Sequence, residues 1–61
     1  MKATLVEDRA GQNNRYKEGK IIKAGTIVTL IGWDEETQCF IGKAGIWALN
    51  FTPDQATPIE D

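Results

Sequence analysis

Short apolar stretches separated by polar residues and glycines make up most of this chain. Residues 2–7, KATLVE, alternate in character and place Ala3 and Leu5 on one side, which predicts a first β-strand. Residues 26–33, TIVTLIGW, are β-branched and aromatic with too little polar punctuation for a helix, and they predict a second strand. Five of these eight positions are Ile, Val, Leu or Trp, so we expect this strand to be covered on both faces for part of its length.

Two further strands and a closing element follow. Residues 38–43, QCFIGK, and residues 46–51, IWALNF, predict strands joined by a tight turn that contains a glycine. Alternation in the second of them puts three large apolar side chains on one face: Trp47, Leu49 and Phe51. Pro53 ends this strand and favours a single helical turn. Residues 57–61 then predict a brief last strand, with Ile59 as its apolar anchor.

A polar segment separates the first two predicted strands. Residues 8–20, DRAGQNNRYKEGK, predict a long loop, within which residues 19–25, GKIIKAG, could form an irregular hairpin. Loops longer than about 12 residues are uncommon in compact domains and are often functional. Closing the sheet would remove its exposed edges. The whole order therefore predicts one all-β domain over residues 1–61: a small five-stranded, half-open barrel with a long first loop and a short helical turn before the last strand.

Length, charge and cysteine content narrow the class of protein. A chain of 61 residues has a core close to the lower limit for folding alone, so a small homo-oligomer stays open beside a monomer. The net charge of −2 argues against a nucleic-acid binder, which usually has a basic domain. No apolar run approaches the roughly 20 residues that span a bilayer, so we expect no membrane contact. A single cysteine and no secretory signal favour the cytoplasm, or the host cytoplasm if a virus or plasmid encodes the chain.

The residue types also limit the chemistry. With no histidine and no serine, the chain has neither a serine–histidine nor a cysteine–histidine pair, and Cys39 in its apolar strand is expected to pack as a small hydrophobe. Paired acids fall in predicted turns, and the segment DEET lacks the spaced ligands and the glycine of a calcium loop. So small a barrel offers little volume for a pocket of about 300 Å³. We expect no catalytic residue, no metal and no cofactor, and therefore no enzyme.

Three stretches together resemble the Src-homology-three family of small barrels. KATLVEDR stands where that family has its opening strand, KAGTIVTL resembles the family's entry into the second strand, and FTPDQATPIE resembles its closing motif. In this alignment Gly25 is the turn glycine, Pro53 falls on the family's proline and Ile59 lies near its final apolar position. The resemblance covers almost the whole chain and implies the topology of that superfamily.

The residues that bind proline-rich peptides in that family are largely missing here. The opening motif has no aromatic residue, the third strand begins with Gln38 and Cys39, and the closing tyrosine falls on Ala56. Proline-rich peptides dock on grooves lined by aromatic side chains. We therefore carry over the topology and not the peptide-binding activity.

Charged and aromatic residues supply the candidates for a binding site. Five of the seven cations fall within residues 9–23, whereas residues 34–36 are all acidic. Trp33, beside those acids at a strand end, is the tryptophan most expected to be exposed, and exposed tryptophan is enriched in interfaces. The candidate partner-binding residues are Arg15, Tyr16, Lys17, Lys20, Trp33, Asp34, Glu35 and Trp47. Core packing for the tryptophans, and a solvated loop of mixed charge for the cations, are the plain alternatives.

Together these features predict a small binding module that docks on another protein, in one form a phage- or mobile-element-encoded accessory or inhibitor protein. One alternative is a nucleic-acid-binding accessory factor that uses the basic loop, with Tyr16 as a stacking platform. Its residues are Arg9, Arg15, Tyr16, Lys17, Lys20 and Lys23. The other alternative is a homo-oligomer subunit whose site forms between chains.

Overall fold

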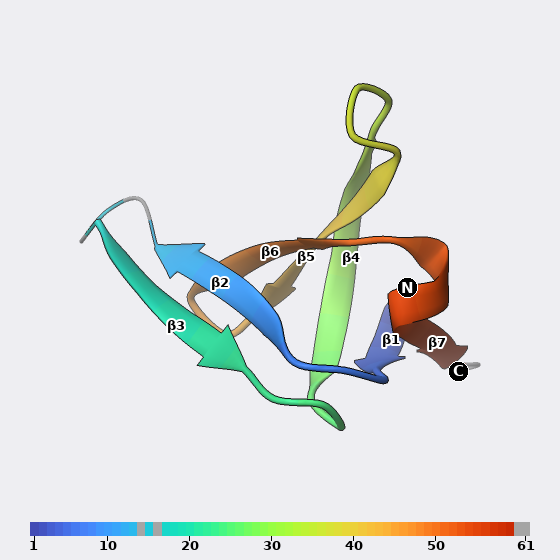
Figure 1. Ribbon diagram of the computed structural model, residues 1–61, viewed down its shortest axis with the longest axis horizontal. Helices are drawn as coiled ribbons and strands as arrows, with labels where there is room; N and C mark the ends of the chain where they lie inside the picture. The colour runs from blue at the N-terminus through green and yellow to red at the C-terminus, as the bar shows by residue number, and fades with distance from the viewer. Residues whose placement is uncertain (14, 16, 60–61) are drawn as a thin grey trace.

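The computed structural model describes residues 1–13, 15 and 17–59, and its fold is all-β, as the sequence predicts (Figure 1). The strands are β1 (Lys2–Leu5), β2 (Arg9–Asn13), β3 (Glu18–Ile22), β4 (Ile27–Asp34), β5 (Cys39–Ala44), β6 (Trp47–Phe51) and β7 (Ala56–Ile59). A single turn of 3-10 helix, η1 (Pro53–Gln55), lies between β6 and β7. The strands form one antiparallel sheet in the order β3-β2-β6-β5-β4-β1-β7.

The strand count and the closure of the sheet correct the expectation of a five-stranded, half-open barrel. Most of the predicted long first loop is itself a hairpin, in which β2 and β3 pair from Arg9↔Ile22 to Asn13↔Glu18. The sheet therefore has seven strands. It is open, because within the described residues β3 and β7 at its two ends are each paired on one side only. Figure 1 shows the β2–β3 hairpin projecting to the left and the β4–β5 hairpin projecting upward.

A side chain holds β2 against the rest of the sheet. Among the described residues, the backbone pairing of β2 with β6 is limited to Gln12↔Ala48. Next to it, the guanidinium of Arg9 donates from Nε and Nη2 to the backbone carbonyl of Asn50, at 3.2 and 3.1 Å. Because a guanidinium presents several donors in a fixed fork, this one side chain replaces part of a strand ladder. Tertiary contacts of this kind turn a segment of low strand propensity into β2.

Gly11 allows the β2–β3 hairpin to lie close to β6. A Cβ atom at this position would lie 2.9 Å from Cγ1 of Ile22 and 3.4 Å from Cβ of Trp47. Ile22 is buried in the core and cannot move aside freely. A residue without a side chain is therefore needed where the hairpin crosses Trp47.

The remaining strands begin and end within one or two residues of their predicted bounds, and they enclose one small core. Its buried apolar members are Ala3, Leu5, Ile22, Val28, Leu49, Phe51 and Ala56. The predicted faces of β1 and β6 are confirmed by this list, with Trp47 half-buried beside it. The expectation that the second predicted strand is covered on both faces is wrong. In β4, Val28 is buried but Ile27 and Ile31 are more than half exposed, so the core covers one face of this strand.

Hydrogen bonds tie the base of the β2–β3 hairpin to the body of the sheet. The Asp8 carboxylate accepts the Ala24 backbone N–H at 2.8 Å through Oδ1, and its Oδ2 lies 3.6 Å from Nζ of Lys23. The backbone N–H of Gly25 donates to the carbonyl of Leu5 at 2.8 Å. The β2–β3 hairpin is thus attached to the sheet at two places. One is its base, and the other is Asn50 of the neighbouring strand β6.

The turn η1 is organised by its own side chains. The backbone N–H of Thr52 donates to Oε1 of Gln55 at 2.8 Å, and the N–H of Gln55 donates to the carbonyl of Thr52 at 3.0 Å. The Thr52 hydroxyl donates to the carboxylate of Asp54. This hydrogen bond, assisted by the backbone N–H of Asp54, lowers the pKa of that carboxyl from its ordinary value of 3.8.

Candidate functional site

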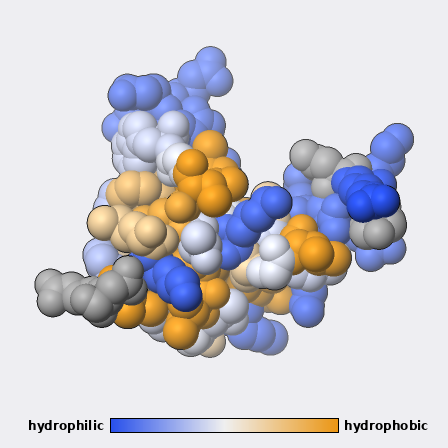
Figure 2. Space-filling model, turned by 180° about the vertical axis from the view of Figure 1, so that it is seen from behind, coloured by the Kyte–Doolittle hydropathy of each residue, from blue (hydrophilic) through white to orange (hydrophobic). Residues whose placement is uncertain are grey.

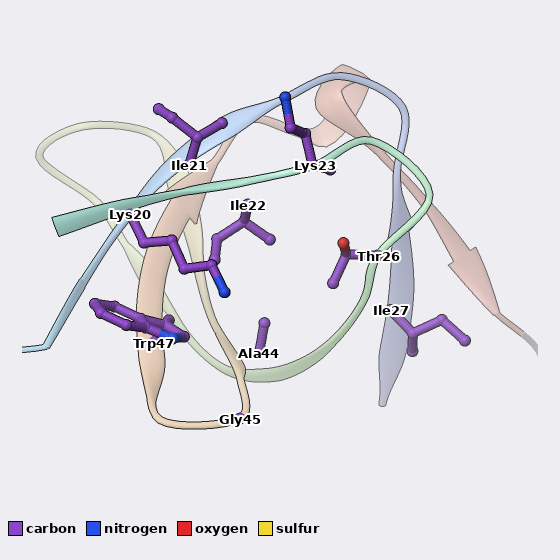
Figure 3. A pocket seen from close by; sticks show the side chains of 9 residues that line it. All are labelled: Lys20, Ile21, Ile22, Lys23, Thr26, Ile27, Ala44, Gly45 and Trp47. Atoms are coloured by element: carbon purple, nitrogen blue, oxygen red, sulfur yellow. The ribbon is translucent and has the colours of Figure 1, made fainter.

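An open groove lies between β3 and the turn that joins β5 to β6 (Figure 3). Its volume is about 350 Å³. The residues that line it are Lys20, Ile21, Ile22, Lys23, Thr26, Ile27, Ala44, Gly45 and Trp47. Volumes of about 300 Å³ and more are typical of ligand pockets. The groove is open, so it offers a surface for contact, and the expectation that so small a chain has little volume for an enclosed ligand pocket stays a prediction.

Lys20 and Trp47 form one end of this groove. The Nζ atom of Lys20 lies 5.9 Å from the centroid of the Trp47 ring, within the range of a cation–π contact. Lys20 is exposed, whereas Trp47 is half-buried and packs against the core. Figure 3 shows the Lys20 side chain running over the groove toward the indole. A flat aromatic surface and an exposed cation therefore lie next to each other at this end of the groove.

The groove follows the edge of β3. In a strand, alternate side chains point to opposite faces of the sheet. Lys20 and Ile22 belong to the face that meets Trp47, whereas Ile21 and Lys23 point to the other face, yet all four line the groove (Figure 3). Within the described residues β3 pairs with β2 alone. The groove is consequently bordered by a strand edge whose backbone groups are free to pair.

The structure divides the basic residues predicted as partner-binding residues between β3 and the turn that precedes it. Arg15 and Lys17 lie in the turn between β2 and β3, and both are exposed. The N–H of Arg15 donates to Oδ1 of Asn13 at 3.0 Å, and Lys17 has a positive φ of 53°. Tyr16 lies outside the described residues. Of the seven predicted partner-binding residues that the structure describes, Lys20 and Trp47 line the groove and the other five do not.

Two cations named for the nucleic-acid alternative have structural contacts. Arg9 is engaged with the carbonyl of Asn50, and Lys23 faces the carboxylate of Asp8. The Lys23 side chain is 77% exposed, so its ion pair is weak. The nucleic-acid alternative stays a prediction, and it now depends chiefly on the turn between β2 and β3.

Trp33, Asp34 and Glu35 lie on the β4–β5 hairpin, away from the groove. Trp33 is 40% exposed, and its ring meets that of Phe40 edge to face, with centroids 4.8 Å apart. Oδ1 of Asp34 accepts the N–H of Glu36 at 3.0 Å, and the carbonyl of Glu35 accepts Nε2 of Gln38 at 2.7 Å. These acids shape a turn. Figure 2, seen from behind, shows that the upper end of this hairpin is hydrophilic and that apolar surface gathers below it.

A smaller hollow of about 190 Å³ opens near the N-terminus and η1. Its lining is apolar throughout: Met1, Ala3, Leu30, Phe40, Phe51, Pro53, Ala56 and Pro58. It has no charged side chain that could orient a partner. The groove beside β3 combines apolar and charged groups and is the stronger candidate.

The residues that sequence reasoning missed are those that complete the groove. The sequence places Ile22 in the possible irregular hairpin of residues 19–25, and it places Thr26, Ala44 and Gly45 in predicted strands and turns, without marking any of them as binding residues. The signal that could have found the first of these was present: the run KII is a strand-like pattern within the predicted hairpin. The contribution of Ala44 and Gly45 depends on the bend of the sheet, which leaves no mark on the local sequence.

In the described part of the chain, no three His, Cys, Asp or Glu side chains gather where they could hold a metal ion. No helix among those residues is long and apolar enough to cross a membrane. No protein-family model, curated protein or solved structure matched the chain.

Proposed function

We propose that this chain is a small non-catalytic binding module that docks on another protein through the groove between β3 and the β5–β6 turn. The observation that carries the proposal is the half-buried Trp47 ring beneath the exposed Lys20 in an open groove of about 350 Å³. Tryptophan that is held by a core and open on one side is a frequent anchor of protein interfaces. The floor of the groove is apolar, with Ile22 and Ala44 beside the indole. Apolar area with two lysines beside it, Lys20 and Lys23, suits a protein surface that offers both apolar side chains and carboxylates.

We also propose that the fold belongs to the group of small barrels with Src-homology-three-like topology. The order of elements supports it: a first strand, a long hairpin, three consecutive strands, a 3-10 turn and a last strand that pairs with the first. The proposed groove does not use the positions at which that family places its peptide-binding aromatics, since neither Cys39 nor Ala56 lines it. Fold and function are therefore argued separately.

The test of the docking function is capture of a partner at two salt concentrations. The protein is immobilised and exposed to extract of its own cell, with and without nuclease treatment, and retained proteins are identified. Lys20→Glu reverses the charge over Trp47, and Lys43→Glu is the matched control, because Lys43 is an exposed cation on β5 that does not line the groove. We expect one protein to be retained by the native chain and by Lys43→Glu, and lost with Lys20→Glu.

Other outcomes count against the proposal. Retention that is identical for both variants would remove the groove from consideration. Retention only at low salt, abolished by the nuclease, would favour the nucleic-acid alternative, because phosphate contacts weaken steeply as salt is added. Sedimentation of the purified chain at several concentrations tests the third alternative, a homo-oligomer subunit.

A further inference from the structure

We infer that the partner contributes an acidic, extended segment that pairs with the free edge of β3 and so adds an eighth strand to the sheet. This inference rests on the proposed docking function and specifies its geometry. An edge strand presents unpaired N–H and C=O groups and is a template for another strand. The groove lies along this edge of β3, so a segment paired there would pass above Ala44 and Gly45.

Of the two sheet edges, β3 is the one suited to pairing. The other end strand, β7, contains Pro58, which has no N–H to donate to a ladder. β3 contains no proline, and Gly19 adds no side chain beside the edge, since even a Cβ there would touch only the carbonyl oxygen of Gly11, at 3.7 Å. The main-chain groups of β3 are thus accessible to an incoming strand.

Side-chain alternation gives the incoming strand two different surroundings. Side chains on one of its faces would lie over Ile22 and the Trp47 ring, whereas those on the other would lie beside Ile21, which is 53% exposed. Both Ile22 and Trp47 favour an apolar or β-branched residue. Lys20, over the indole, provides a partner for a carboxylate on the same face. A segment in which two aliphatic residues alternate with two acidic residues carries both kinds on each face and matches this pattern.

Charge argues for an acidic segment and against a second copy of this chain. Residues 15–23 contain four cations, Arg15, Lys17, Lys20 and Lys23, and one acid, Glu18, which gives this segment a charge of 4 − 1 = +3 in a chain whose total is −2. Lysine on an edge strand opposes pairing with a like strand. Two copies in antiparallel pairing about Lys20 of β3 would bring the two Lys20 side chains together and set Lys17 of one copy opposite Lys23 of the other, whereas an acidic strand would neutralise them.

The test uses a synthetic peptide as the probe. A terminally blocked peptide of eight residues, in which two valines alternate with two glutamates so that each face carries both, is titrated into ¹⁵N-labelled protein, and amide shifts and hydrogen exchange are recorded. We expect shifts confined to β3 and the β5–β6 turn, with slower exchange at alternate amides of β3. A peptide in which lysine replaces every glutamate should bind more weakly. Lys20→Glu should weaken the acidic peptide about fivefold, and the control Lys43→Glu should leave its affinity within about twofold.

Strand pairing is separated from simple groove binding by methylating the peptide backbone. In two further peptides, one or the other alternate set of amide nitrogens is N-methylated. Because only one set faces β3 in a paired strand, one methylated peptide should lose binding and the other should bind like the parent. Any result other than this one-sided loss overturns the inference, as does a parent peptide that does not bind.

The inference and the proposed function fail in different ways. If the acidic peptide does not bind but capture of a partner still depends on Lys20, the docking function stands and strand addition is wrong. If capture does not depend on Lys20 either, both are wrong.

Discussion

The guanidinium of Arg9 and the backbone carbonyl of Asn50 are joined by two hydrogen bonds, of 3.2 and 3.1 Å. They lie where the pairing between β2 and β6 is otherwise limited, in the described residues, to Gln12↔Ala48. The contact therefore attaches the β2–β3 hairpin, with its free edge, to the remainder of the sheet. Arg9, which the sequence suggests as a nucleic-acid contact, therefore has a structural role.

Substituting Arg9 should loosen the hairpin without unfolding the sheet. We expect Arg9→Ala to lower the free energy of unfolding by about 1–2 kcal/mol, since hydrogen bonds from a charged donor are lost. Arg9→Lys should restore little of it, because an ammonium cannot reproduce the fork. Hydrogen exchange should become faster in β2 and β3 before it does so in β5. Lys43→Ala is the control, and equal exchange in both variants would contradict the assigned role.

Two glycines of the same hairpin should respond in opposite directions to alanine. Gly11→Ala places a Cβ 2.9 Å from the buried Ile22 side chain, and we expect a loss of about 1–3 kcal/mol from overpacking. Gly19→Ala meets only ordinary contact at 3.7 Å, so it should be neutral or stabilising by up to about 1 kcal/mol. Urea denaturation of both variants measures the difference. A Gly11→Ala variant as stable as Gly19→Ala would show that the Ile22 side chain does not pack closely against Gly11.

The two tryptophans should differ in their effect on stability. Trp33 is 40% exposed and rests on Phe40, so Trp33→Ala should leave a folded protein and lower its stability by about 1 kcal/mol. Trp47 is half-buried against the core, and Trp47→Ala should lose about 2–3 kcal/mol. Because a core of this size supplies only about 3–5 kcal/mol in total, the second variant should be close to unfolding. Thermal denaturation followed by circular dichroism distinguishes the two, and equal losses would be contrary to the assigned burial.

Acid should remove a contribution that Asp54 makes to stability. The hydrogen bond from the Thr52 hydroxyl lowers the pKa of the Asp54 carboxyl, so the folded state binds this proton less readily than the unfolded chain does. The contribution is present above the ordinary value of 3.8 and is lost as the pH falls through the lower, folded value. We expect Thr52→Val to raise the pKa of Asp54 toward 3.8 in a ¹³C NMR titration of the carboxyl group.

The control for this titration is Thr57→Val, a change at an exposed position of β7. It should leave the Asp54 titration where it is in the native chain. If the pKa of Asp54 is unchanged in Thr52→Val, the Thr52 hydroxyl does not donate a hydrogen bond to the Asp54 carboxylate.

The parts of the fold that the sequence predicts are those in which local pattern and burial agree. Ala3 and Leu5 alternate with polar neighbours, and both are buried. Leu49 and Phe51 do the same in β6, and Pro53 ends that strand at the 3-10 turn. In each case the residues that form the strand also make its core contacts. A short stretch of sequence is therefore enough to predict both the strand and its buried face.

The β2–β3 hairpin could not be predicted in this way, because its strands depend on contacts with distant residues. The residues of β2, RAGQN, have little strand propensity, and their pairing depends on Asn50 and Ala48, far away in the sequence. Lys20 and Trp47 were both proposed as binding residues, yet only the bend of the sheet brings them together. A contact between distant strands depends on register and curvature, which no local pattern specifies.

Site-specific photo-crosslinking tests the central claim, that a partner docks beside β3, most directly. A benzoylphenylalanine is placed at Ile21, which is 53% exposed at the edge of β3, or at Ile31, which is 57% exposed on β4 and does not line the groove. After irradiation in cell extract, adducts are separated and identified. The account predicts one protein adduct from position 21, lost when Lys20→Glu is added, and none from position 31. An adduct formed only from position 31, or equally from both, would contradict it.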